Sequence, residues 1–331
     1  MSDDSTRSTH GRRQFLALSA AAAVARVLPA RAASAATRPR GIGGVAVGAI
    51  SYSFRDLPGD AAKVLEYLLA CGVDTVELMG DAAEDYAGAP PFPRYLDLAA
   101  SGMTPAQQKT HMAAYEKENA RVEVARNQWR KSVSMSRYQK LRKLYDDAGV
   151  KVDILKLGEA SWPDADIDYA YNVASVLGAR GISFEAEDQA AKRMGAFADK
   201  HNLLNGMHNH MQYADAAFNV DKLLAYSTRN NLNLDVGHYM ASTGHSPIPF
   251  LQKYHARITH LHLKDRRSLA HGGDNMPWGQ GDTPLREVLQ LLQKERYPIS
   301  AMVELEYPVP KDSSVLGEMR KCVEYCRAAL A

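Results

Sequence analysis

The amino-acid sequence predicts an α/β protein that folds as a single (β/α)8 TIM barrel with a helical insertion on the loop after the second strand. Two observations support this fold. From Val45 to the C-terminus, short β-branched or apolar runs alternate with amphipathic helical segments, which is typical of β-α units around a parallel sheet. Eight such runs are present, and eight β-α units close into a barrel.

The expected strands lie at residues 45–54, 75–78, 152–157, 181–184, 204–208, 232–236, 258–263 and 301–305. Helical patterns follow at residues 59–70, 167–177, 189–201, 221–228, 284–294 and 314–330. A doubly wound open sheet is the competing fold, but it usually has a glycine-rich turn directly after its first strand. Here the glycines at 41–44 precede the first strand, so we favour the barrel.

The gap between the second and third expected strands is longer than one crossover helix needs. Thr104 followed by Pro105 combines a helix cap with proline at the first helical position, which predicts a long helix through about Met135. Residues 136–148 then supply the ordinary crossover helix. We expect residues 81–134 to be a helical insertion on the face where barrel active sites lie, acting either as a lid or as a homo-oligomer contact.

Residues 1–35 have the features of an export signal in the right order. Arg12 and Arg13 precede an apolar run that ends at Leu28, and small residues follow at 30–35. The paired arginines resemble the twin-arginine class, so we expect the twin-arginine export machinery as a partner and a periplasmic or otherwise exported barrel of residues 36–331. The run is too short to predict a membrane span. The alternative is a cytosolic protein with a frayed amphipathic tail.

Composition and charge exclude several function classes. The 331 residues are 46% hydrophobic and 24% charged, which excludes a disordered, collagenous or coiled-coil chain. The formal net charge is +2, and a surplus of +3 lies in the first 35 residues, which leaves about −1 for the rest. Residues 36–331 are therefore nearly neutral. Proteins that bind nucleic acid or anionic lipid usually carry a clear excess of positive charge, so we expect neither as a partner.

Polar residues end six of the eight expected strands. In a barrel these ends converge on one pocket, so ionisable residues there indicate chemistry. They are Glu77, Glu185, Glu187, His208, Asn209, His210, Asp235, His238, His260, His262, Lys264, Asp265, Glu304 and Glu306. Two imidazoles and two carboxylates from neighbouring strands suit a divalent Mn, Co, Zn or Fe ion, and a hydrogen-bonded structural network is the alternative.

Strand parity narrows the choice of ligands without fixing it. His260 and His262 share a face, as do Glu304 and Glu306, because alternate residues of a strand point to opposite sides. His208 and His210 also share a face, so that either binds metal while the other contacts substrate. Parity leaves each of these pairs open, and with the family resemblance that follows, the predicted ligands are His208, Asp235, His262 and Glu304.

Four motifs resemble those of the xylose-isomerase-like TIM-barrel superfamily of sugar isomerases and epimerases. They are Met207-His208-Asn209-His210, Leu234-Asp235-Val236-Gly237-His238, His260-Leu261-His262-Leu263-Lys264-Asp265 and Val303-Glu304. In its ketose-epimerase branch, Glu, Asp, His and Glu from the fifth to eighth strands hold a divalent ion. The resemblance implies Asp235, His262 and Glu304 as ligands and His238 as a substrate contact. His208 stands where that branch has a glutamate that also moves protons.

The resemblance implies a divalent-metal-dependent isomerase or epimerase that acts through an enediolate on a free or keto-sugar. Glu185, His210 and Glu304 are the candidate catalytic bases, and Lys264 is expected to neutralise an alkoxide. Asn209 and Trp278 are expected to contact the substrate. Tyr52, Trp162 and Tyr239 are further aromatic residues of strand-end loops that suit stacking on a sugar.

Two alternatives remain open. A metal-dependent lyase or dehydratase acting on a keto-sugar or keto-glycoside would use the same intermediate, and the absence of the fifth-strand glutamate favours it slightly. A non-catalytic exported carbohydrate-binding protein would keep the pocket without turnover. Export also makes sugar phosphates less suitable substrates, since they are scarce outside the cytoplasm, and the sequence has no glycine-rich phosphate loop.

Overall fold

Eight parallel strands close into a barrel, as predicted. The computed structural model describes residues 41–93 and 103–331, so the expected signal at residues 1–35 lies outside the described residues. Around the barrel the strands follow the order β1, β10, β7, β6, β5, β4, β3, β2, with β2 next to β1 again. Their bounds are β1 Val47–Ile50, β2 Thr75–Met79, β3 Lys151–Lys156, β4 Gly181–Glu185, β5 Leu204–His208, β6 Asn230–Asp235, β7 Ile258–Leu263 and β10 Ser300–Val303.

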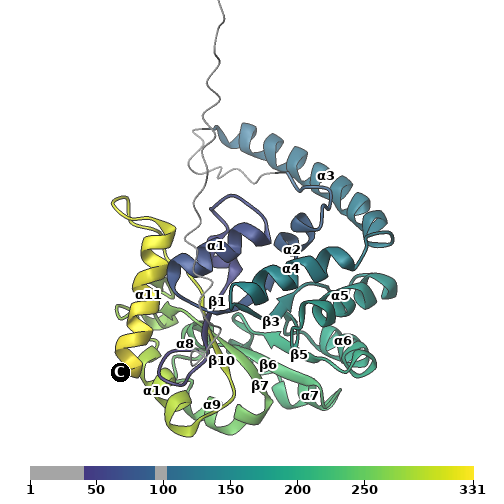
Figure 1. Ribbon diagram of the computed structural model, residues 1–331. Helices are drawn as coiled ribbons and strands as arrows, with labels where there is room; N and C mark the ends of the chain where they lie inside the picture. Colours follow the sequence, from purple (N-terminus) through teal and green to yellow (C-terminus); the bar gives the residue numbers. More distant parts are fainter. Residues whose placement is uncertain (1–40, 94–102) are drawn as a thin grey trace, which may run out of the picture. The chain divides into compact units, whose positions relative to one another are not determined.

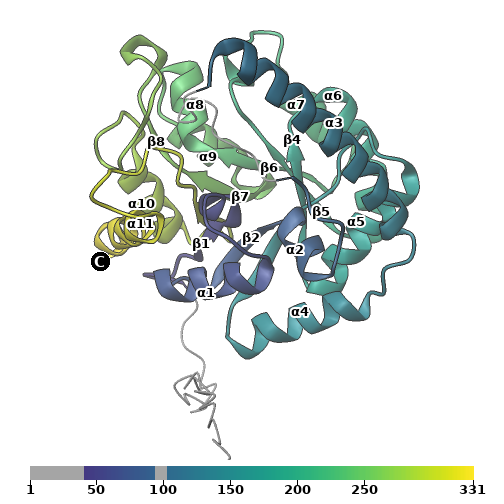
Figure 2. The same ribbon diagram turned by 90° about the horizontal axis from the view of Figure 1, so that it is seen from above.

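Helices lie around the outside of this barrel (Figures 1 and 2). The main ones are α1 Ala61–Cys71, α4 Ser136–Asp147, α5 Asp164–Leu177, α6 Asp188–His201, α7 Val220–Ala225, α9 Ile248–Tyr254, α10 Leu285–Glu295 and α11 Val315–Leu330. Shorter elements in the loops are α2 Gly80–Tyr86, α8 Val236–Thr243 and the hairpin of β8 Asp265–Arg266 and β9 Asn275–Met276. Among the described helices, none is both long and apolar enough to cross a membrane.

The helices form where the sequence has an apolar stripe and a cap. In α10, Leu285, Val288, Leu289 and Leu292 are buried at spacings of three and four, so that one face packs on the barrel. The carboxylate of Asp60 caps α1 by accepting hydrogen bonds from two backbone N–H groups. Such faces make the core continuous between strands and helices.

Two sequence predictions about element ends are wrong. The first strand was expected to run to residue 54, but it ends at Ile50 and continues as the 3-10 turn η1, Ser51–Phe54. Serine hydroxyls hold this turn, since Ser51 Oγ accepts a 2.8 Å hydrogen bond from the Met79 N–H and Ser53 Oγ donates to the Val303 carbonyl. The long insertion helix, expected to reach about residue 135, ends at Arg130.

The insertion after β2 consists mainly of α3, Pro105–Arg130, which lies beside α2 and α5 (Figures 1 and 2). Thr104 and Gln107 form a capping box at its start, as the Thr-Pro pair predicts. Near its other end, Arg126 and Arg130 donate to the buried carboxylate of Glu84 at 3.0 and 2.7 Å. These ion pairs attach the C-terminal half of α3 to α2, because removing one partner would leave buried charge uncompensated.

We expect Glu84→Gln to lower the free energy of unfolding by about 3 kcal/mol, because two buried guanidinium groups lose their shared counter-charge. The matched control is Glu118→Gln on α3, which removes an exposed pair with Arg121 and should change stability by under about 1 kcal/mol. Urea denaturation followed by circular dichroism measures both. Equal stability of the two variants would contradict this account of how α3 is attached.

Candidate metal centre and active site

Four predicted ligands meet at the C-terminal end of the barrel. His208 and Asp235 are the last residues of β5 and β6, His262 lies in β7, and Glu304 follows β10 directly. These strands are neighbours in the barrel, and the register places Asp235 opposite His262. One ligand atom from each residue lies within 4.8 Å of the others, and all four residues are buried. We call this set the four-residue cluster.

The atoms that face one another in the cluster suit a divalent ion. His262 Nδ1 lies 2.9 Å from Glu304 Oε2, and His208 Nε2 lies 3.5 Å from Asp235 Oδ2. These same four atoms are buried and lack a hydrogen bond of good geometry, because they face one another and the Lys264 ammonium. Two imidazole nitrogens and two carboxylate oxygens form the mixed donor set that first-row divalent metals favour. The residues therefore fit a metal site of the kind that the sequence predicts.

Lys264 supplies the positive charge at the cluster. Its Nζ lies 2.9 Å from both Asp235 Oδ2 and Glu304 Oε2, and 2.6 Å from Glu306 Oε2. Burial opposes the charged form of Lys264, but these carboxylates outweigh it and raise its pKa. Burial likewise opposes ionisation of Asp235, yet the positive charge of Lys264 holds its pKa well below the usual range. The carboxylates of the cluster are thus kept ionised.

Glu77 of β2 orients one ligand from inside the barrel. Its Oε2 pairs with Nε2 of His260 at 3.1 Å and with Nε2 of His262. A carboxylate on one imidazole nitrogen leaves the other nitrogen to face a metal, and here Nδ1 of His262 faces the cluster. Burial opposes protonation of His262, but Glu304 and Glu77 raise its pKa to about 10. His260 was the other candidate on the same face of β7. It lies two residues earlier in the strand, pairs with Glu77 and is not part of the four-residue cluster.

Sequence reasoning noted Glu77 at a strand end but assigned it no role. A signal was present, because Glu77 interrupts the apolar strand residues Val76 and Leu78. A carboxylate in a fully buried strand requires polar partners inside the protein.

Glu185 orients a second ligand from β4. Its Oε2 lies 3.1 Å from His208 Nδ1 and 3.4 Å from His210 Nδ1, while Lys156 Nζ lies 2.8 Å from its Oε1. Burial opposes ionisation of Glu185, but the His208 hydrogen bond and the Lys156 charge outweigh it and lower its pKa. With Nδ1 directed at Glu185, His208 presents Nε2 to the cluster. Glu185 is therefore placed to position both histidines.

Asn209 and His238 lie beside Asp235. The Asn209 amide donates to the Asp235 carbonyl at 3.2 Å and accepts from its N–H at 3.0 Å, so it fixes the backbone of that ligand. The His238 N–H donates to Asp235 Oδ1 at 2.7 Å, and its ring Nε2 lies 3.2 Å from Lys264 Nζ. Burial and the nearby positive charges lower the pKa of His238 to about 3, so its ring is neutral.

Asp265 and Trp278 belong to the loop after β7. The Asp265 carboxylate accepts backbone hydrogen bonds from Gly279, Gln280, Gly281 and Thr283, so it anchors this loop. The neighbouring Lys264 pairs with the carboxylates of the cluster and with Glu306, and not with Asp265. Trp278, predicted to contact substrate, packs edge-on against Tyr325 of α11, with ring centroids 5.6 Å apart.

Comparison with known proteins agrees with the fold and the motifs. Residues 172–326, just under half of the chain, match the family model described as xylose isomerase-like TIM barrel. An inosose dehydratase from Clostridium tetani is 30% identical over 133 residues, which are 34% of this chain and 44% of that protein. The match therefore spans less than half the length of this curated relative.

Solved structures share the barrel at low sequence identity. A sugar phosphate isomerase/epimerase from Parabacteroides distasonis has a TM-score of 0.55 at 18% identity, covering 92% of this chain and 99% of that one. A 3-keto-D-glucoside 4-epimerase from E. coli has a TM-score of 0.55 at 11% identity, covering 86% and 99%. These likenesses show the fold alone. The partial family match makes this chain similar to xylose isomerase-like TIM barrels, and the compared proteins are named as an isomerase/epimerase, a 4-epimerase and a dehydratase.

We expect protein purified without added metal to carry about one Mn, Co, Zn or Fe ion per chain, and Glu304→Gln to lose it, because the variant removes a charged ligand from the cluster. Elemental analysis by plasma mass spectrometry gives the stoichiometry. Glu306→Gln is the matched control: its carboxylate contacts Lys264 two residues further along the chain, outside the cluster, and it should keep the ion. Full metal retention in Glu304→Gln would contradict the proposed ligand set.

Proposed function

We propose that the protein is a divalent-metal-dependent enzyme that removes a proton next to the carbonyl of a free or keto-sugar and returns it as an isomerase or epimerase does. The observation that carries this proposal is the convergence of four buried ligand atoms, two imidazole nitrogens and two carboxylate oxygens, at the ends of β5, β6, β7 and β10. A divalent ion held there would polarise a carbonyl and its neighbouring hydroxyl, which acidifies the C–H bond between them and stabilises an enediolate.

His210 is the catalytic base that the geometry favours. Its side chain is half exposed, so that a substrate can reach it, whereas Glu304 is buried in the cluster. Burial and the neighbouring His208 lower the pKa of His210, which leaves its ring neutral and able to accept a proton near pH 7. With Nδ1 directed at Glu185, its Nε2 is left to act on the substrate.

Lys264 and His238 would bind and stabilise the charged intermediate. The raised pKa of Lys264 keeps it cationic beside the cluster, where it offsets negative charge on a substrate oxygen. His238 is neutral and borders both Lys264 and the half-exposed ring of His210, at a centroid separation of 4.8 Å. We expect it to hydrogen-bond a substrate hydroxyl while His210 moves the proton.

Elimination is the second candidate reaction, and His208 is the observation that favours it. His208 stands on β5 where the ketose epimerases have a glutamate that serves as a second proton carrier. One base fewer is therefore available to return the proton to the opposite face of the sugar, as epimerisation requires. The relative from Clostridium tetani is a dehydratase by name. An unsaturated product that absorbs in the ultraviolet, formed without any epimer, would identify elimination. Saturable sugar binding with no turnover at any metal loading would instead identify a binding protein.

Proton abstraction is the step common to isomerisation, epimerisation and elimination, so its test does not depend on the final product. We expect metal-loaded protein to incorporate deuterium from D2O into a ketohexose or a 3-keto-glucoside, measured by NMR. His210→Gln should slow this exchange about 100-fold or more while keeping the metal. His245→Gln, on an exposed loop after α8, is the matched control and should exchange normally. Unchanged exchange in His210→Gln would assign the base elsewhere.

We also propose that the enzyme works outside the cytoplasm, on the strength of the paired Arg12 and Arg13 and the apolar run that follows. Export in a folded state would allow the metal to be bound before translocation. A free or keto-sugar suits that location better than a phosphorylated one.

A further inference from the structure

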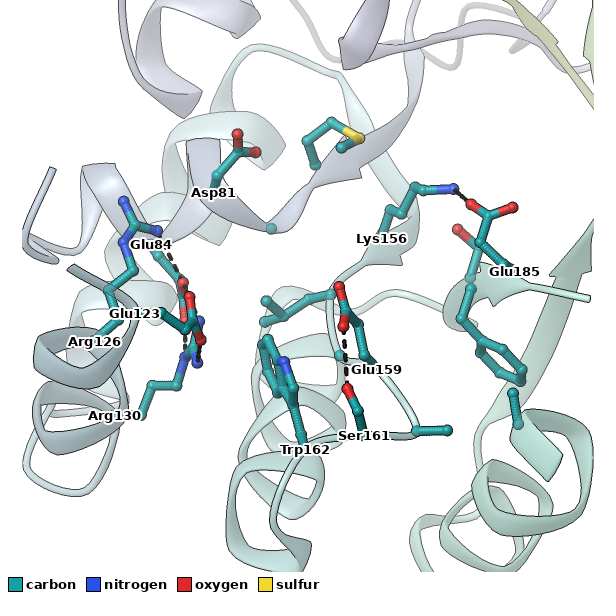
Figure 3. Close-up of a pocket in the computed structure, with 18 of the residues that line it drawn as sticks. Asp81, Glu84, Glu123, Arg126, Arg130, Lys156, Glu159, Ser161, Trp162 and Glu185 are labelled. Atoms are coloured by element: carbon teal, nitrogen blue, oxygen red, sulfur yellow. Dashed lines mark hydrogen bonds and ion pairs between the residues drawn. The ribbon is translucent and has the colours of Figure 1, made fainter. Parts of the chain in front are cut away.

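A pocket of about 560 Å³ opens beside the four-residue cluster, between α3 and the ends of β2, β3 and β4. Figure 3 shows Lys156 and Glu185 on one side of it and the Arg126 and Arg130 side chains on the other. Glu185 belongs to both regions, because it lines the pocket and also lies 3.1 Å from the ligand His208. The pocket is thus one side chain away from the cluster.

We propose that this pocket binds the second, hydroxylated ring of a neutral glycoside whose reacting sugar ring lies at the four-residue cluster. The inference rests on the proposed function for the position of the reacting ring. It defines the substrate class further, since a single sugar ring at the cluster would leave the pocket unused. A volume of about 560 Å³ is in the range that small-molecule sites occupy.

The charges of the pocket argue against a phosphate or carboxylate on the bound ring. Six acidic residues line it against three basic ones, and each basic side chain is already paired. Arg126 and Arg130 donate to Glu84, and Lys156 pairs with Glu185. Recognition of a phosphate normally takes a free arginine or lysine, and the described lining residues offer none. Three of the lining carboxylates, those of Asp81, Glu159 and Glu187, pair with no described lysine or arginine, so a neutral group with several hydroxyls that can donate to them fits this wall.

Aromatic residues give the pocket an apolar surface as well. The Arg130 guanidinium lies 4.0 Å from the centre of the Trp162 ring, and that of Arg126 lies 4.1 Å from the centre of Phe92. Because both arginines are fixed by Glu84, they hold these rings in place before a ligand arrives. Apolar surface beside hydrogen-bond acceptors matches a sugar ring, which has an apolar C–H face and a rim of hydroxyls.

The insertion supplies one wall of this pocket through Glu123, Arg126 and Arg130 of α3. The opposite wall comes from the strand ends with Lys156 and Glu185, and the loop after β3, which carries Glu159, Ser161 and Trp162, lies between the two walls. A binding pocket that needs both parts gives the insertion a role in substrate selection.

The test compares binding of one-ring and two-ring sugars to the full-length protein by isothermal titration calorimetry. The probes are glucose, glucose 6-phosphate, and the disaccharides cellobiose, maltose and trehalose. We expect at least one disaccharide to bind ten times more tightly than glucose, and glucose 6-phosphate to bind no more tightly than glucose. Equal affinity for glucose and all three disaccharides would overturn the proposal, as would a tenfold preference for the phosphate.

Two variants test whether the pocket is responsible. Ser161→Phe adds volume at an exposed lining residue without removing any packing, and should reduce the disaccharide advantage to less than twofold. Trp162→Ala should reduce it as well, with folding checked by circular dichroism. Tyr297→Ala is the matched control, because this aromatic residue lines a different pocket, beside the start of β10, and should leave the advantage intact. An advantage that survives Ser161→Phe would overturn the assignment.

The same titration on Glu304→Gln separates this inference from the proposed function. Glu304 does not line the pocket and contacts none of the aromatic or arginine side chains that do, so the disaccharide advantage should persist in that variant without metal. Loss of metal binding or deuterium exchange in the wild type, with the advantage retained, would refute the reaction and leave the pocket assignment standing. Normal exchange without any disaccharide advantage would refute the pocket assignment alone.

Discussion

The burial of ionised carboxylates at one end of the barrel is the constraint on which the rest of the site depends. Taking Asp235 and Glu304 out of water is costly unless positive charge lies in contact with them. Lys264 meets that need with one ammonium placed 2.9 Å from an oxygen of each. A divalent ion bound to the same oxygens would share this role, so the charge balance of the cluster suits both a cationic side chain and a metal.

Each of the two histidine ligands is oriented by a carboxylate that comes from another strand. Glu77 reaches His262 from β2, and Glu185 reaches His208 from β4. In each case a carboxylate occupies one ring nitrogen, so that the other nitrogen faces the cluster. Since the strands of a closed barrel are fixed relative to one another, these orientations are set by the fold before any ligand binds. Such preorganisation is what an electrostatic mechanism requires.

Much of the fold and part of the site follow from sequence because they depend on local pattern. The strands at 204–208 and 258–263 have the predicted bounds, and the polar residues at their ends converge as parallel strands dictate. Parity could not choose between His260 and His262, because both face the interior and only depth separates them. The roles of Glu77 and Asn209 depend on partners far away in sequence, which periodicity does not reveal. The end of the first strand was missed because serine hydroxyls, rather than side-chain pattern, fix that turn.

The long charged helix of the insertion shows why composition alone misjudges a polar segment. The sequence alone does not distinguish whether its arginines face solvent, a partner subunit or a substrate phosphate. In the fold, Arg126 and Arg130 are buried against Glu84 and stack over Phe92 and Trp162, so their charge is already neutralised. They therefore act on a ligand through the rings that they hold in place. A phosphate would have to compete with Glu84 for the guanidinium groups, whereas a neutral sugar ring leaves those ion pairs intact.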